Sequence, residues 1–128
     1  MPKKALEVMT ESMLYTMMAF QSGPRCGIEI SALVEKLTSN RVELGPGTLY
    51  TILSKFLEVG YLRELSAEGR KRTYELTGKG RQAYQKELER LRRCLSDAET
   101  VTKLLSREGG VQDETAGPHL AVAPVPAL

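Results

Sequence analysis

Tryptophan is absent from this 128-residue chain, and cysteine, histidine and long apolar runs are scarce. The single histidine and the two cysteines, Cys26 and Cys94, form no Cys-x-x-Cys pair, so a zinc site is not expected. No apolar stretch approaches the roughly 18 residues that span a bilayer, and the N-terminal MPKKALEVMTES lacks the pattern of a secretory signal. We therefore expect a cytoplasmic protein with reduced thiols, no metal or other cofactor, and no membrane partner.

The sequence also lacks the motifs that enzymes need. It has no glycine-rich phosphate loop ahead of a helix, no nucleophile motif and no cluster of metal-ligating side chains. Its acidic residues are scattered over faces that the hydrophobic periodicity assigns to solvent. Enzymatic activity is therefore not expected.

Positive charge gathers in one part of the chain, although the net charge is only +2. Residues 63–93 hold ten basic and five acidic side chains, a local net of +5, whereas residues 1–62 hold six of each. Residues 94–128 hold two basic and five acidic side chains, a net of −3. A local basic patch is typical of a phosphate-binding surface. For residues 81–93 alone, a solvated helix face is the favoured interpretation.

Apolar residues recur every three or four positions in two segments of the N-terminal half, which predicts amphipathic helices. The first helix spans residues 4–21 and ends before Gly23-Pro24, because proline cannot continue a helix. The second spans residues 29–37 and ends at Ser39-Asn40. The side chains expected on their buried faces are Leu6, Met9, Met13, Met17 and Phe20, then Ile30, Leu33, Val34 and Leu37.

A third helix is predicted from Gly45-Pro46-Gly47 to Gly60, because proline suits a first helical turn and glycine often follows a helix end. Its apolar stripe is opposed by a face of short polar or basic side chains, which suits a helix that fits into a DNA groove. An ordinary solvated face is an equally good interpretation of that pattern alone. The residues proposed to contact DNA from this helix are Thr48, Tyr50, Thr51, Ser54 and Lys55.

Two β-like runs follow, at residues 61–65 and 71–76, and residues 66–69 supply the turn between them. Gly69 suits this turn because it takes a positive φ at little cost. Arg70, Lys71 and Arg72 gather positive charge where the second run begins. A helix followed by a basic hairpin is the layout of a winged helix-turn-helix, in which the hairpin grips the DNA backbone. The predicted fold is therefore mostly α with a small β-hairpin.

A fourth, long helix is predicted to begin after Thr77, which reads as its N-cap. Its apolar positions alternate between spacings of four and three, a heptad seam that a monomer would leave exposed. A partner helix from a second copy, and hence a homodimer, is the natural inference. The seam residues are Tyr84, Leu88, Leu91, Leu95, Ala98, Thr102 and Leu105.

These patterns predict three parts. Residues 1–76 form a winged helix-turn-helix DNA-binding domain, and residues 77–107 form a C-terminal dimerisation helix. Residues 108–128 are rich in glycine, alanine and proline without periodicity, which predicts a flexible tail.

Over about residues 5–95 the chain resembles the PadR family of winged-helix transcriptional regulators. The matching motifs are Gly47-Thr48-Leu49-Tyr50, Ile52-Leu53, Leu57, Gly60-Tyr61-Leu62, Gly69-Arg70-Lys71-Arg72-Thr73-Tyr74, Leu76-Thr77 and Gly80. Many members carry H-G-Y before the second helix, where this chain has Cys26-Gly27-Ile28. The contact made by that aromatic ring is therefore not carried over.

The resemblance implies a homodimer in which the fourth helix packs against the partner's first and fourth helices. The residues expected at that interface are Met9, Met13, Met17, Tyr84, Leu88, Leu91 and Leu95. It also implies release from DNA by a small hydrophobic or aromatic effector. The expected effector-binding residues are Met13, Met17, Tyr84 and Leu88, with plain core or interface packing as the favoured alternative. The absence of tryptophan excludes the mode in which some members stack flat drugs between tryptophans.

The leading hypothesis is a repressor that binds double-stranded DNA at a near-palindromic operator. The alternative is a winged-helix module that binds another protein, since a fold does not fix its function. Salt distinguishes the two, because DNA binding through several phosphates weakens steeply as salt rises.

Overall fold

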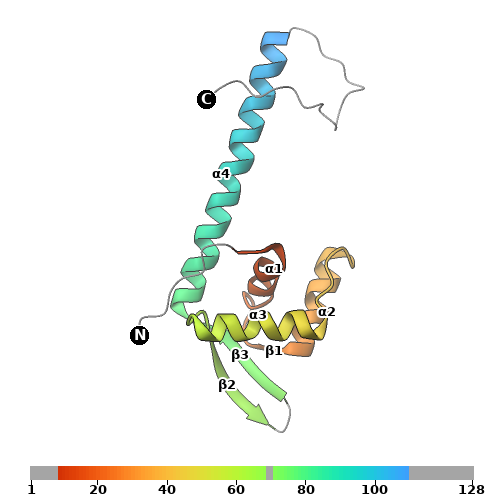
Figure 1. Cartoon of the computed structure of the whole chain (residues 1–128), viewed down its shortest axis with the longest axis vertical. Helices are drawn as coiled ribbons and strands as arrows, with labels where there is room; N and C mark the ends of the chain where they lie inside the picture. Colours follow the sequence, from red (N-terminus) through yellow and green to blue (C-terminus); the bar gives the residue numbers. More distant parts are fainter. Residues whose placement is uncertain (1–8, 69–70, 110–128) are drawn as a thin grey trace. The chain divides into compact units, whose positions relative to one another are not determined.

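A computed structural model describes residues 9–68 and 71–109 of the chain. Within them the chain forms helices, a three-stranded sheet and a long last helix, which is the predicted winged helix-turn-helix fold (Figure 1). The elements, in order, are α1 (Glu11–Ala19), β1 (Arg25–Cys26), α2 (Gly27–Thr38), α3 (Pro46–Glu58), β2 (Leu62–Glu68), β3 (Lys71–Leu76) and α4 (Gly78–Gly109). The predicted turn glycine, Gly69, and the proposed DNA contact Arg70 lie outside the described residues.

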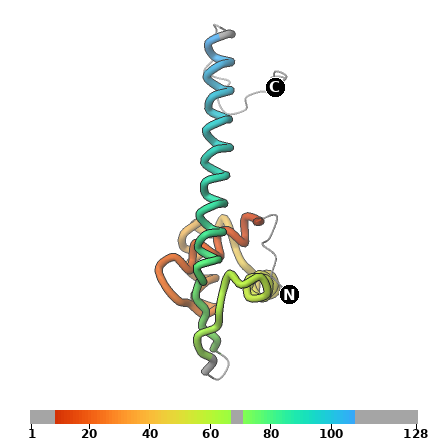
Figure 2. Tube along the Cα trace, turned by 90° about the vertical axis from the view of Figure 1, so that its left-hand side faces the viewer, coloured from red at the N-terminus to blue at the C-terminus, as the bar shows by residue number. Residues whose placement is uncertain are grey.

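The chain divides between Arg90 and Leu91 into two compact units. The first unit contains α1 to α3, the sheet and the beginning of α4, and the second contains the remainder of α4. In both views the β2–β3 hairpin projects beyond the three short helices (Figure 1, Figure 2). The proposed DNA-contacting elements, α3 and the hairpin, therefore belong to the same unit.

The core of the first unit is built from α1, α2, α3 and the adjoining strands. Met17, Ile30, Val34 and Phe56 are fully buried at its centre. Met17 was predicted to lie at the dimer interface and to bind an effector, and this prediction is wrong for a direct contact. Its side chain is 0% exposed within its own chain, so it has no surface left for a partner or ligand.

The first helix is shorter than the periodicity indicates. Met9 and Thr10 are not helical, and Thr10 is the N-cap of α1, where its hydroxyl accepts a hydrogen bond from the Met13 N–H at 3.2 Å. A continuous helix over 4–21 is therefore wrong. An apolar stripe carries no information about the residue at which capping begins a helix.

The second helix buries a different residue in its last turn from the one predicted. Leu37 is 56% exposed, whereas Thr38 is buried. The Thr38 hydroxyl donates to the Val34 carbonyl at 2.8 Å and accepts from the Val42 N–H at 3.0 Å. A threonine whose hydroxyl is satisfied in this way fits the core, and it ties the end of α2 to the loop that leads to α3.

The sheet has the strand order β1-β3-β2, and both pairings are antiparallel. The sequence did not predict β1, which has only two residues and no readable alternation. The register of β2 against β3 shifts between Glu64 and Ser66, so Leu65 sits at a β-bulge. Before the shift, Leu62 is opposite Leu76 and Glu64 is opposite Tyr74.

The chain turns from α3 into β2 at Gly60, the predicted helix stop. Gly60 has a φ of +84°. Its N–H donates to the Leu57 carbonyl at 3.2 Å, and the Tyr61 N–H donates to the Phe56 carbonyl at 2.8 Å. These two bonds form a Schellman motif, and the rings of Phe56 and Tyr61 pack with centroids 5.8 Å apart across it. The direction of the hairpin is thus set at the end of α3.

The same corner receives the start of α4. The Thr77 hydroxyl donates to the Gly60 carbonyl at 2.6 Å and accepts from the Gly80 N–H at 3.0 Å, which confirms Thr77 as the predicted N-cap. The Thr77 N–H donates to the Tyr61 carbonyl at 3.0 Å. Gly80 lies so close that a Cβ built on it would be 2.2 Å from the Tyr61 carbonyl oxygen. The third position of α4 therefore has no room for a side chain.

In the second unit α4 continues as a regular helix to Gly109. Its large apolar side chains are exposed, with exposed fractions of 37% for Leu91, 61% for Leu95 and 40% for Leu105. These three belong to the predicted heptad seam, which lies open along this part of the chain.

We expect Gly80→Ala to lower the free energy of unfolding by about 3 kcal/mol, because the new methyl group must displace backbone at Tyr61. Gly78→Ala is the matched control, since a Cβ there meets nothing within 4 Å. It should leave stability unchanged or raise it by up to about 1 kcal/mol, as alanine favours helix. Urea denaturation followed by circular dichroism measures both. Equal effects of the two substitutions would contradict the close approach.

Candidate nucleic-acid interface

The outer face of α3 carries all five residues predicted to contact DNA from this helix. Each of them is exposed, and none belongs to the core. Tyr50 is the most prominent large side chain among them, at 65% exposed. The Thr51 hydroxyl donates to the Gly47 carbonyl at 2.9 Å within the same helix. The residues on this face are Thr48, Tyr50, Thr51, Ser54 and Lys55.

The second cluster of predicted contact residues lies where β3 begins. Lys71 and Arg72 are both exposed there. The Arg72 guanidinium forms an ion pair with the Glu64 carboxylate of β2 at 3.3 Å. On the same hairpin Arg63 forms an ion pair with Glu75. Each of the two arginines therefore has a carboxylate on the neighbouring strand.

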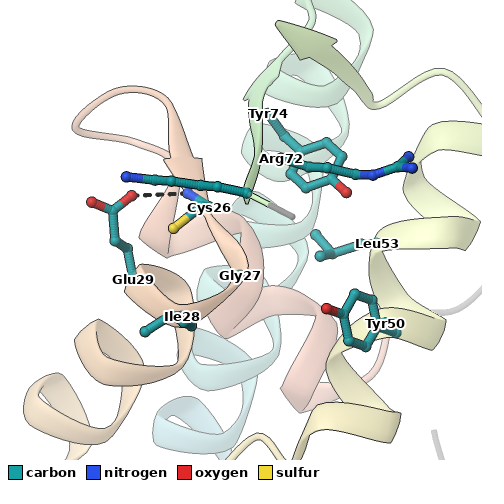
Figure 3. Close-up of a pocket in the computed structure, with 9 residues that line it drawn as sticks. Cys26, Gly27, Ile28, Glu29, Tyr50, Leu53, Arg72 and Tyr74 are labelled. Atoms are coloured by element: carbon teal, nitrogen blue, oxygen red, sulfur yellow. Dashed lines mark hydrogen bonds between the residues drawn. The ribbon is translucent and has the colours of Figure 1, made fainter. Parts of the chain in front are cut away.

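A pocket of about 460 Å³ joins these two clusters. It opens between the start of α2, the middle of α3 and the start of β3 (Figure 3). Tyr50 and Ile28 lie on opposite sides of it, and Arg72 reaches from β3 toward α3. Its lining residues are Cys26, Gly27, Ile28, Glu29, Tyr50, Leu53, Lys71, Arg72 and Tyr74.

The start of α2 supplies one wall of the pocket. The Cys26 N–H donates to the Glu29 carboxylate at 2.9 Å, a reciprocal cap across the first turn (Figure 3). This hydrogen bond holds the pKa of the Glu29 carboxyl below its ordinary value, and the nearby charges of Lys71 and Arg25 act in the same direction. Arg25 in turn donates from Nε to the Ala19 carbonyl at 2.7 Å, which ties β1 to the end of α1.

Two residues of the pocket were missed by the sequence reasoning. Ile28 is 83% exposed at the start of α2, where an apolar side chain gives no sign of its surroundings. Tyr74 is buried, and both this burial and the negative charge of Glu64 raise the pKa of its hydroxyl. Alternation along β3 could have identified Tyr74, because Arg72, Tyr74 and Leu76 must share one face of the strand.

The arrangement suits a polyanion better than a small neutral molecule. Two cations, Lys71 and Arg72, stand beside an exposed helix face that offers hydroxyl groups and a lysine. Guanidinium and ammonium groups bind phosphate oxygens, and hydroxyl groups bind either phosphates or base edges. Across residues 9–68 and 71–109, no three His, Cys, Asp or Glu side chains are grouped to hold a metal ion.

The residues predicted at the dimer interface have different surroundings. Met9, Met13, Tyr84 and Leu88 are half-buried within the first unit, and Leu91 and Leu95 are exposed in the second. Tyr84 and Met13 pack against the edge of the core. None of the four residues predicted to bind an effector lines the pocket between α2, α3 and β3. In the described part of the chain, no helix is apolar over a length that would cross a bilayer.

Comparison with known proteins identifies the family. The model of the transcriptional regulator PadR-like family matches residues 11–86, more than half of the chain. The chain belongs to this family. The predicted resemblance is therefore confirmed, and the match includes α1 to α3, the sheet and the beginning of α4.

Among characterised and uncharacterised sequences, this PadR-family chain is similar to an uncharacterised 37.1 kDa protein of transposon TN4556 from Streptomyces fradiae. The two are 31% identical over 108 residues, which make up 83% of this chain and 28% of that protein. The chain thus spans little more than a quarter of the length of this relative.

Solved structures share the fold. A transcriptional regulator from Clostridium thermocellum superposes with a TM-score of 0.63 at 20% identity, covering 69% of this chain and 89% of that one. RosR of H. salinarum gives 0.60 at 21% identity, covering 84% and 98%. Bacillus subtilis PadR, in complex with operator DNA, gives 0.55 at 15% identity, covering 90% and 83%. At these identities the comparison confirms the winged-helix fold of the PadR-family chain.

We expect Glu29→Gln to destabilise the protein at neutral pH, because a charged acceptor caps α2 more strongly than a neutral amide. The folded pKa of Glu29 is lowered, so its stabilising contribution is present above the ordinary value of 4.5 and is lost as the pH falls through the folded pKa. The two proteins should therefore converge in stability below about pH 4.5. A difference in urea midpoint that stays constant from pH 7 to pH 3 would contradict the charged cap.

Proposed function

We propose that this chain is a DNA-binding transcriptional repressor that acts as a homodimer. The observation that carries the proposal is the single surface on which the exposed face of α3 adjoins Lys71 and Arg72. Membership of the transcriptional regulator PadR-like family supports it. So does the likeness in fold to Bacillus subtilis PadR, whose structure is a complex with operator DNA.

In this proposal α3 enters the major groove and the hairpin contacts the backbone beside it. Thr48, Thr51 and Ser54 have hydroxyl groups that can bond to base edges, and Lys55 and the Tyr50 hydroxyl can reach phosphates. Lys71 and Arg72 contribute affinity for DNA of any sequence, because backbone contacts carry no base information. Arg70 keeps its proposed role as a third cation of the hairpin.

A homodimer would present two such surfaces. Two copies of α3 related by a two-fold axis read half-sites about one helical turn apart, roughly 34 Å, which makes the operator near-palindromic. The exposed seam of α4 supports this assembly, because leucines at heptad spacing pack against a partner helix. We therefore assign residues 1–76 to DNA binding and 77–107 to dimerisation.

The proposal includes release from DNA by a small hydrophobic or aromatic effector held between the subunits. Met13, Tyr84 and Leu88 are half-buried in the single chain and so keep surface that a ligand can cover. Methionine and single rings form an adaptable apolar site. Loose selectivity and affinity no better than about micromolar are expected, on the order of −8 kcal/mol.

A winged-helix module that binds another protein is the competing function, and salt separates it from DNA binding. Affinity for a random-sequence duplex of about three turns should fall linearly with salt on a log–log plot. The double variant Lys71→Ala, Arg72→Ala should bind more weakly and lose about two from the slope per hairpin, one for each phosphate contact. Fluorescence anisotropy over a range of salt concentrations measures both quantities.

Arg63→Ala is the matched control for the hairpin. Arg63 lies on the same hairpin but is opposite Glu75, on the strand face that Arg72 and Tyr74 do not share. This variant should keep the slope of the wild type. An unchanged slope in the Lys71, Arg72 double variant would remove the hairpin from the proposal, and binding that does not depend on salt would favour the protein-binding module.

The seam of α4 gives a second prediction. Leu91→Asp should break the dimer, because burying an unpaired charge in a helix interface costs several kcal/mol, about 3 to 5. Leu104→Asp is the matched control, since Leu104 is 47% exposed on the same helix but lies off the heptad spacing. Sedimentation at micromolar concentration should show a dimer for the wild type and the control, and a monomer for Leu91→Asp. A monomeric wild type would contradict the seam.

A further inference from the structure

The two ion pairs of the hairpin lie on opposite faces of its strands. Arg63 is directly opposite Glu75 in the register, whereas Glu64 is opposite Tyr74. Side chains alternate along a strand, so Glu64 shares the face of Tyr74 and Arg72. The Glu64–Arg72 pair therefore lies on the α3 side of the sheet and the Arg63–Glu75 pair on the other.

Only the first of these two pairs reaches the candidate interface. Arg72 and Tyr74 line the pocket beside α3, and neither Arg63 nor Glu75 does. The Glu64 carboxylate is also close enough to Tyr74 for its charge to act on the tyrosine hydroxyl. A negative charge therefore stands next to the cation that the proposed function assigns to the DNA backbone.

The Glu64–Arg72 contact is one that a phosphate can displace. It is a single hydrogen bond of 3.3 Å, and the two side chains are 35% and 62% exposed. Exposed pairs of this kind contribute little to stability. Phosphate oxygens make shorter, often bidentate bonds to a guanidinium group. A phosphate that binds Arg72 must nevertheless approach to within several ångströms of the carboxylate, which repels it.

We propose that Glu64 competes with DNA phosphates for Arg72 and so lowers the affinity of the hairpin for DNA of any sequence. This inference rests on the proposed function. Because the effect acts on a backbone contact, it weakens operator and bulk DNA by the same factor and leaves base discrimination unchanged. A regulator that faces a large excess of non-specific sites is thereby kept in exchange rather than retained on bulk DNA.

The test uses the full chain and a random-sequence duplex of about three turns, because no operator is needed for a sequence-independent effect. Glu64→Gln should tighten binding by about three- to tenfold per hairpin, the low end of Coulomb repulsion at this separation for an exposed pair. Glu64→Thr, which removes the same charge and favours a strand, should give the same gain. Circular dichroism melting confirms that each variant is folded.

Two controls separate competition from a change in overall charge. Glu75→Gln removes the same charge from the same hairpin but leaves Glu64 and Arg72 paired, so its gain should be smaller. In an Arg72→Ala background, the gain from Glu64→Gln should shrink to that of Glu75→Gln, because the competed cation is gone.

Equal gains from Glu64→Gln and Glu75→Gln would overturn the inference, since net charge alone would then explain them. Weaker binding by Glu64→Gln would also overturn it, because Glu64 would then orient Arg72 for DNA instead of competing for it. A wild-type chain that binds no duplex at low salt would reject the proposed function itself. That result is distinguishable, because the competition requires measurable binding in every variant.

Discussion

The close packing of four chain segments at Gly60 and Tyr61 is the constraint on which the first unit depends. The end of α3, the start of β2, the end of β3 and the start of α4 meet there through backbone hydrogen bonds. The Lys79 ammonium adds a bond to the Val59 carbonyl at 2.8 Å. Backbone groups at such a junction need partners because they are shielded from water, and here each segment satisfies another.

This junction fixes the relation between the helix and the hairpin that together form the candidate interface. A Schellman turn admits little variation in direction, since its two hydrogen bonds and the contact between Phe56 and Tyr61 define the path of the chain. The wing cations are therefore held at a set position relative to α3 by backbone geometry. Their own ion pairs are exposed and contribute little to that placement.

The parts that sequence could predict are those set by local chemistry. Glycine at the end of α3, threonine before α4 and proline at the start of α3 each have one conformational reason to be there, and the structure confirms all three. The exposed face of α3 also followed from periodicity alone. The overall fold and the family were within reach because these signals occur at the spacing of a known motif.

The parts that sequence could not predict depend on tertiary partners. Met17 and Met13 look alike in the apolar stripe, but only the packing of α2 and α3 decides that Met17 is fully enclosed. Thr38 replaces Leu37 in the core because the Val42 N–H lies within reach of its hydroxyl. β1 exists because β3 offers it an edge, and Glu64 lies beside Arg72 only through a register that includes a bulge.

The outer face of α3 is separate from everything that keeps the domain folded. Its five exposed residues add no side chain to the core, and Thr51 bonds only within its own helix turn. Substitutions on this face are thus nearly silent for folding, since surface changes away from special features alter stability little. Such a helix can acquire new base preferences through successive single changes. The architecture is therefore highly evolvable, and its descendants can diverge in the genes they control while keeping one scaffold.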